Sequence, residues 1–168
     1  MHNARTLLLD SRQIQQRIDR LAYQVYEDNY DIPELFIAGI ANSGFVVAER
    51  LESAINRICP IKTHLLRLTV DKDEPTRCTI DPQISKDVLR NKVVIVVDDV
   101  LNSGKTLMYS LRPFLDADMR KIRTALLVDR DHKRYPVEAD FVGMTLSTTL
   151  QEHIRVEFSA GQEAVYLE

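Results

Sequence analysis

The sequence is poor in cysteine and contains no long hydrophobic run. Its two cysteines, Cys59 and Cys78, form no CxxC pair, and no group of cysteine and histidine has the spacing of a zinc site. Nothing in the chain therefore calls for an oxidising compartment or a zinc ion. The apolar run Leu7-Leu8-Leu9 near the N-terminus is too short for a signal-peptide core or a membrane span. We expect a cytoplasmic protein.

An excess of positive charge is also missing. The 168 residues carry a formal net charge of −3, whereas a general nucleic-acid binder is usually basic because phosphate contacts drive its affinity. The composition is that of an ordinary globular protein, with 45% hydrophobic and 28% charged residues. The length fits one compact domain, and no linker or repeat interrupts it, so we expect a single domain over residues 1–168.

Helical and strand patterns alternate over the first two-thirds of the chain. Apolar residues at helical spacing predict helices over 11–29, where Ser11 can serve as the cap, and over 45–58. A third helix starts near Thr106, and Pro113 should kink or shorten it. Short apolar runs predict buried strands at 35–40, 61–70, 93–97 and 122–128. Weaker strand candidates lie at 79–80, 141–142, 153–158 and 164–167.

This order of elements predicts an α/β fold, a doubly wound and mainly parallel sheet with helices on both faces. In such sheets ligands bind at the carboxyl ends of the strands. Two loops fall at that edge, Ala41–Gly44 and Asp98–Thr106.

The loop from Asp98 to Thr106 has the composition of an anion site next to two acids. Small residues around Gly104 let backbone N–H groups point into one concavity, and the following helix adds further donors. Lys105 contributes a cation, so a phosphate is the natural occupant. The adjacent carboxylates of Asp98 and Asp99 would repel a second phosphate, and would instead accept hydrogen bonds from hydroxyls or face a divalent ion. Together these features describe a ribose 5-phosphate site.

Two other interpretations compete for this loop. An acid that follows a strand often only caps the next helix, but a pair of acids followed by Ser-Gly-Lys-Thr is more specific than that. The residues Gly104-Lys105-Thr106 also match the end of a nucleotide-binding P-loop. That motif needs a glycine five residues before Gly104, where this chain has Asp99.

The stretch Val93–Thr106 resembles the signature of type I phosphoribosyltransferases. More of the chain is similar to one branch of that family, the pyrimidine-operon attenuator/uracil phosphoribosyltransferase proteins. The similar stretches are 37–51, 93–111, 125–143 and 156–168. The resemblance implies a phosphoribosyltransferase fold with a small hood. It also implies transfer of the 5-phosphoribosyl group from phosphoribosyl pyrophosphate to a nucleobase, with release of pyrophosphate, by a homodimer.

The resemblance also implies a role for each site residue. The catalytic positions would be Asp98, Asp99 and Asn102, and the two aspartates would hold the ribose hydroxyls and face Mg²⁺, which rides on the pyrophosphate. The remaining roles concern the substrate: Asn102, Ser103, Gly104, Lys105 and Thr106 for the 5-phosphate; Ala41, Asn42, Ser43 and Gly44 for the pyrophosphate; Lys72 in a hood over the site; and Asp129 and Arg130 beside the base.

The chain departs from the family pattern at several of these positions. The uracil branch usually has Lys and Arg where this chain has Ala41 and Ser43, so two cations are missing beside the leaving group. Asn102 replaces the Asp of purine-type relatives and the Tyr of the uracil branch, and an amide cannot serve as a base. The base therefore stays open between uracil and a purine.

These departures leave a non-catalytic function open. The same fold could bind nucleotides without turnover, or regulate pyrimidine genes by binding RNA. Asp19 and Tyr23 stand in the N-terminal helix where the RNA-binding relatives present a basic surface. The charge pattern argues against RNA as a partner.

Overall fold

The computed structural model describes residues 5–71 and 73–168. Its main sheet has six strands in the order β4-β3-β2-β5-β6-β7. The neighbouring pairs from β3 to β7 are parallel, and β4 runs antiparallel to β3 at one edge. The strands of this sheet are β2 (Glu34–Ile40), β3 (Lys62–Val70), β4 (Cys78–Asp81), β5 (Val93–Leu101), β6 (Lys121–Asp129) and β7 (Phe141–Thr145).

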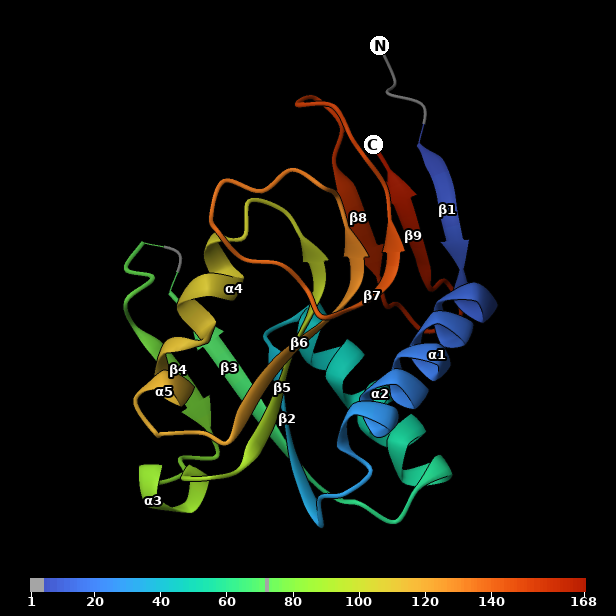
Figure 1. Ribbon diagram of the computed structural model, residues 1–168. Coiled ribbons are helices and arrows are strands. Elements are labelled where there is room, and N and C mark those ends of the chain that lie inside the picture. The colour runs from blue at the N-terminus through green and yellow to red at the C-terminus, as the bar shows by residue number, and fades with distance from the viewer. Residues whose placement is uncertain (1–4, 72) are drawn as a thin grey trace.

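Helices cover both faces of the sheet, as Figure 1 shows. Two long helices, α1 (Ser11–Asn29) and α2 (Ser43–Ile58), lie on one face, and α3 (Lys86–Leu89), α4 (Lys105–Ser110) and α5 (Arg112–Leu115) lie on the other. Alternate residues of each central strand face opposite sides. Ile37 and Ile95 pack under α1 and α2, whereas Phe36 and Val94 join the core beneath α4 and α5. The expected doubly wound α/β sheet is confirmed.

The structure also has a second sheet, of three strands. It consists of β1 (Thr6–Asp10), β9 (Ala164–Leu167) and β8 (Ile154–Glu157), paired antiparallel in that order. Figure 1 shows this sheet at the end of the molecule where the parallel strands finish. Leu9 and Val165 anchor it, because both are buried in the same core as α1 and α2.

Several expected boundaries need correction. Asp10, not Ser11, caps α1: its carboxylate accepts from the Gln13 N–H at 2.8 Å, and the Gln13 side chain accepts from the Asp10 N–H at 2.9 Å. The strand expected to end at residue 97 continues to Leu101. Pro113 does interrupt the helical pattern, because α4 ends at Ser110 and α5 begins at Arg112. The sequence pattern did not predict β1 or α3.

Candidate active site

A pocket of about 330 Å³ opens at the carboxyl edge of the main sheet. It is built from the end of β5, the loop after it and the start of α4, with contributions from the ends of β2 and β3. The residues that line it are Ile40, Ala41, Val70, Asp98, Asp99, Val100, Leu101, Asn102, Ser103, Gly104, Lys105, Thr106 and Leu107. The whole stretch 98–106 that the sequence singled out therefore lines one cavity.

The two acids are part of strand β5, not of the loop beyond it. Asp98 is paired with Leu126 of β6, and the ladder resumes with Val100 opposite Val128, so Asp99 lies at a break in the pairing. The Asp99 N–H donates to Asp98 Oδ1 at 2.9 Å, and the Val100 N–H donates to Asp99 Oδ1 at 2.8 Å. Each carboxylate thus accepts from the N–H of the next residue in the chain, at the rim of the pocket.

The carboxyl group of Asp98 is strained electrostatically. Asp98 is half-buried where it lines the pocket. Burial, and then the neighbouring charge of Asp99, raise the pKa of Asp98 well above its usual range. A divalent cation beside the pair would relieve both effects. Two carboxylates at an open pocket also match how Mg²⁺ binds proteins, through one or two carboxylates plus substrate oxygens. Asp98 and Asp99 therefore fit Mg²⁺.

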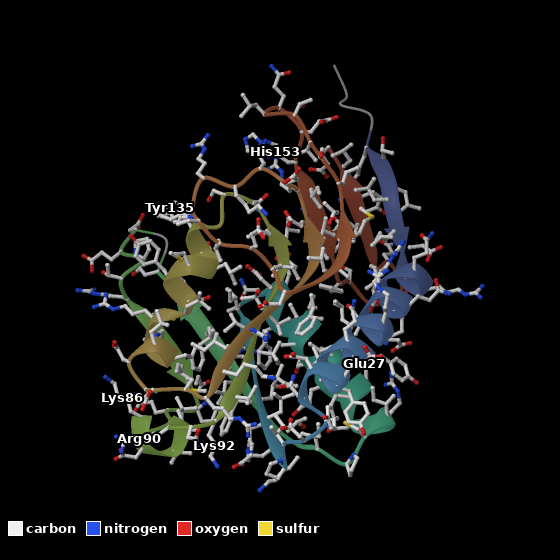
Figure 2. The ribbon with its side chains drawn as sticks, in the orientation of Figure 1. Glu27, Lys86, Arg90, Lys92, Tyr135 and His153 are labelled. Atoms are coloured by element: carbon white, nitrogen blue, oxygen red, sulfur yellow. The ribbon has the colours of Figure 1, made fainter. Side chains whose placement is uncertain are left out.

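The loop after β5 has a fixed backbone. Gly104 has φ +83°, in the left-handed region, and an added Cβ would lie 2.6 Å from Val137 Cγ1. The Ser103 carbonyl accepts from the N–H groups of Arg134 and Tyr135 at 2.8 and 3.1 Å. Figure 2 shows Tyr135 beside α4, where its ring meets Tyr109 edge-on. The segment after β6 thus packs against the loop and donates hydrogen bonds to it, while Lys105 and Thr106 stay exposed at the pocket.

The loop after β2 approaches the acids because β2 and β5 are parallel neighbours. The Ala41 N–H donates to the Leu68 carbonyl at 2.8 Å, and Ala41 lines the pocket. Gly44, in the first turn of α2, lies directly against Asp98, since an added Cβ would lie 2.5 Å from Asp98 Oδ1 and 3.0 Å from its Cα. Asn42 is exposed and Ser43 half-buried between these contacts. The predicted residues Ala41–Gly44 therefore adjoin the acid pair.

Asp129 ends β6, next to the acid-pair strand, Arg130 follows it, and both residues are buried. Asp129 Oδ1 accepts from the Asp131 N–H at 2.8 Å, and Lys133 Nζ lies 3.6 Å from Asp129 Oδ2. The guanidinium of Arg130 binds protein groups: the Thr148 hydroxyl, the carbonyls of Thr149 and Glu152, and the side chain of Asn102. Among the described residues, Arg130 thus joins the acid-pair loop to the segment after β7.

Lys72, the residue expected in the hood, lies outside the described residues. The connection around it leads from β3 to β4. Asp71 accepts from the N–H groups of Asp73 and Glu74 at 2.8 and 3.1 Å, and these bonds lower the pKa of Asp71. Val70 precedes this connection and lines the pocket, so the connection begins at the site.

Sequence reasoning missed several contributors to the site. Ile40 and Val70 line the pocket as ordinary apolar strand residues, and Val137 and Tyr135 support the loop around Gly104 from a distant part of the chain. The bond from Arg130 to Asn102 spans 28 positions. No local pattern signals such contacts. His153, labelled in Figure 2, lies just before β8 and pairs with Glu168 through its backbone.

Two classes of site are not found in the described part of the chain. Within residues 5–71 and 73–168, no three His, Cys, Asp or Glu side chains gather as a metal site. None of the described helices has the length and apolar character needed to cross a bilayer.

A mainly parallel α/β sheet with an acid pair and a glycine-bearing loop in one pocket at its carboxyl edge defines the class of type I phosphoribosyltransferases. Residues 5–160 match the family model of the phosphoribosyl transferase domain. The chain belongs to this family and is a phosphoribosyltransferase, that is, a pentosyltransferase.

The curated relatives are similar over nearly their whole length. The bifunctional protein PyrR of Macrococcus caseolyticus is 33% identical over 161 residues, covering 89% of this chain and 90% of the relative. The bifunctional protein PyrR of Fusobacterium nucleatum is 32% identical over 173 residues, covering 96% and 97%. The chain is thus close to the branch that the sequence motifs indicated.

Solved structures share the fold at lower identity. The hypoxanthine phosphoribosyltransferase of Trypanosoma cruzi superposes with a TM-score of 0.76 at 17% identity, covering 96% of this chain and 95% of that one. A hypoxanthine-guanine phosphoribosyltransferase from Bacillus anthracis gives 0.72 at 21% identity, covering 89% and 84%. These likenesses confirm the fold.

Proposed function

We propose that this protein transfers the 5-phosphoribosyl group from phosphoribosyl pyrophosphate to a nucleobase, uracil or a purine, and releases pyrophosphate. Residues 1–168 act as one catalytic domain, in a homodimer. The observation that supports this best is the single pocket in which the acid pair meets the loop around Gly104. That pocket offers carboxylates for a diol and backbone donors for a phosphate.

Each part of the pocket then has a chemical task. The backbone and side chains of Ser103, Gly104, Lys105 and Thr106, with Asn102 at their start, hold the 5-phosphate. Asp98 and Asp99 accept hydrogen bonds from the ribose hydroxyls and face Mg²⁺. The bound metal would neutralise charge on the leaving pyrophosphate. Burial and the charge of Asp99 raise the pKa of Asp98. A bound cation or donor hydroxyls would therefore stabilise the ionised form of the pair.

The loop from Ala41 to Gly44 receives the pyrophosphate in this proposal. Substitution at the anomeric carbon passes through an oxocarbenium-like state, as in glycoside transfer. The carbon–oxygen bond breaks with its electron pair on pyrophosphate, and the base nitrogen supplies the pair for the new bond. Backbone donors of Asn42, Ser43 and Gly44 stabilise the leaving group where the chain lacks cations. Lys72 belongs to the segment that would close over the site and exclude water.

The test is release of pyrophosphate from phosphoribosyl pyrophosphate and Mg²⁺ with each nucleobase in turn. We expect turnover with one base or base class, and loss of Mg²⁺ should abolish it. Asp99→Asn should lower kcat/KM by at least about a hundredfold, since it removes a charge that faces substrate and metal. Asp87→Asn, an exposed acid in α3, is the matched control and should leave turnover unchanged. Equal turnover by Asp99→Asn would remove the assigned role of that residue.

A nucleotide-sensing regulator on the same fold is the second candidate. It is favoured by the missing cations at Ala41 and Ser43 and by the bifunctional relatives. The surface of α1 does not favour RNA binding, because two cationic groups there already have protein partners. Arg57 pairs with Asp19, and Arg20 donates to the carbonyls of Val142 and Gly143. Nucleotide binding without any pyrophosphate release would favour this candidate over the enzyme.

A further inference from the structure

A second cavity, of about 370 Å³, opens on the face of the main sheet that carries α3 and α5. Its walls come from the edge strand β4, the connection from β4 to α3, α3 itself and α5. Figure 1 shows these elements next to one another at the β4 edge of the sheet. Among the described residues, none lines both this cavity and the active-site pocket. The proposed phosphoribosyl transfer therefore gives the second cavity no role.

The floor of the second cavity is apolar and is fixed by the core. Leu89 of α3 lines the cavity and is buried. Cys78, Ile80 and Ile84 are half-buried, because they pack against the core beneath α4 and α5 and also line the cavity. Pro113 adds an apolar wall from α5. Cavities of this size with a mainly apolar floor are typical of small-molecule sites, and covering such a floor with an apolar group is favourable.

The rim of the second cavity carries more positive than negative charge. Lys86 of α3 and Arg112 of α5 are exposed there, and among the described lining residues one carboxylate, that of Asp116, accompanies them. Lys86 Nζ lies 3.8 Å from Asp116 Oδ2, and both side chains are more than half exposed, so this ion pair contributes little. Figure 2 shows Lys86 at the surface near Arg90. The rim therefore attracts an anionic group and repels a cationic one.

We propose that this cavity binds a small amphipathic anion, a molecule with an apolar body and one anionic group at its end. The apolar body covers the floor around Ile80 and Leu89, and the anionic group lies between Lys86 and Arg112. Charge complementarity selects this class of ligand. An uncharged apolar molecule would leave both cations without an anion, and a cationic one would add to their repulsion. The site is independent of the proposed phosphoribosyl transfer.

The first test uses octanoate as the probe, with two relatives that each change one feature. Octylammonium keeps the apolar chain and reverses the charge, whereas hexanoate keeps the carboxylate and lacks two methylene groups. We expect saturable binding of octanoate in isothermal titration calorimetry. The dissociation constant should be at least about tenfold higher for octylammonium, because it meets two cations, and about tenfold higher for hexanoate, because it buries less apolar surface. Equal dissociation constants for octanoate and octylammonium would overturn the proposal.

The two cysteines of the chain report where octanoate binds. Cys78 lines the second cavity, whereas Cys59 follows α2 and packs against the core on the opposite face of the sheet. Burial raises the pKa of the Cys78 thiol to about 11, so its alkylation by iodoacetamide is slow at neutral pH and is best followed at about pH 9. Saturating octanoate should slow alkylation of Cys78 several-fold and leave Cys59 unchanged, as measured by mass spectrometry of the two peptides. An unchanged rate at Cys78 would refute the proposed location.

Arg112→Gln tests the cationic rim. It should raise the dissociation constant of octanoate about threefold or more and reduce the difference between octanoate and octylammonium. Arg90→Gln is the matched control, because it removes the same charge from an exposed arginine that pairs with Asp87 and is not part of the cavity lining. Octanoate should bind to it as to the wild type. If both variants bind octanoate equally well, the anionic group does not lie at Arg112 and the proposal is wrong. None of these measurements needs turnover, so their outcome does not depend on the proposed enzyme activity.

Discussion

Replacement of Gly104 by alanine tests the loop at the centre of the pocket. Gly104 has φ +83°, which an L residue adopts at a cost of roughly 1–2 kcal/mol. The added Cβ would also lie 2.6 Å from Val137 Cγ1. A valine methyl cannot move away as the end of a flexible chain would. Relief of this overlap by displacement of the loop or of the segment after β6 should add about 1–3 kcal/mol.

Gly161 provides a matched control for this change. Its φ is +79°, nearly the same, but an added Cβ would meet no atom within 4 Å. Gly161→Ala should therefore lose only the conformational part of this stability, about 1–2 kcal/mol, whereas Gly104→Ala should lose about 2–5 kcal/mol. For a chain of this length each 1 kcal/mol lowers Tm by about 2–4 °C. Gly104→Ala should thus melt clearly below Gly161→Ala.

The assay is urea unfolding of the wild type, both alanine variants, Val137→Ala and the double variant Gly104→Ala/Val137→Ala. Removal of the Val137 methyl groups should recover the steric part, so the double variant should be about 1–3 kcal/mol more stable than the sum of the single changes predicts. Gly104→Ala should also raise KM for phosphoribosyl pyrophosphate, and Gly161→Ala should not. If Gly104→Ala is no less stable than Gly161→Ala, the contact with Val137 does not constrain the loop.

The remaining predictions concern neighbouring groups. Because the folded-state pKa of Asp98 is raised, wild-type stability should fall as pH rises from the unfolded value near 4 through the folded value. Urea titrations of Asp98→Asn should show a weaker pH slope, and added Mg²⁺ should reduce the difference. Gly44→Ala, whose Cβ would lie 2.5 Å from Asp98 Oδ1, should lower kcat about tenfold or more; unchanged kcat would show that the contact is unimportant. Thr124→Val should lose about 1–2 kcal/mol of stability in urea melts, because the buried Thr124 hydroxyl bonds Asp140 at 3.1 Å and accepts from its N–H at 3.0 Å.

Strong local patterns predicted the scaffold well. The five β-branched residues Val93–Val97 and the apolar stripe of α1 gave the right element types, because burial on a sheet or under a helix demands that spacing. Boundaries were less predictable. β5 runs on through the acid pair, since its pairing with β6 tolerates polar residues where the sheet edge meets the pocket. The local pattern did not predict β1, because its partner β9 lies at the other end of the chain.

For the site, the sequence alone determined the chemistry, because the acid pair and the glycine-bearing loop lie within nine consecutive residues, 98–106. Only the tertiary structure decided how they are held. Gly44 against Asp98, Val137 behind Gly104 and Arg130 on Asn102 are contacts between segments far apart in the chain. Parallel strands bring such segments together at the carboxyl edge of the sheet. The spacing of side chains within one segment does not indicate which distant residues pack against it.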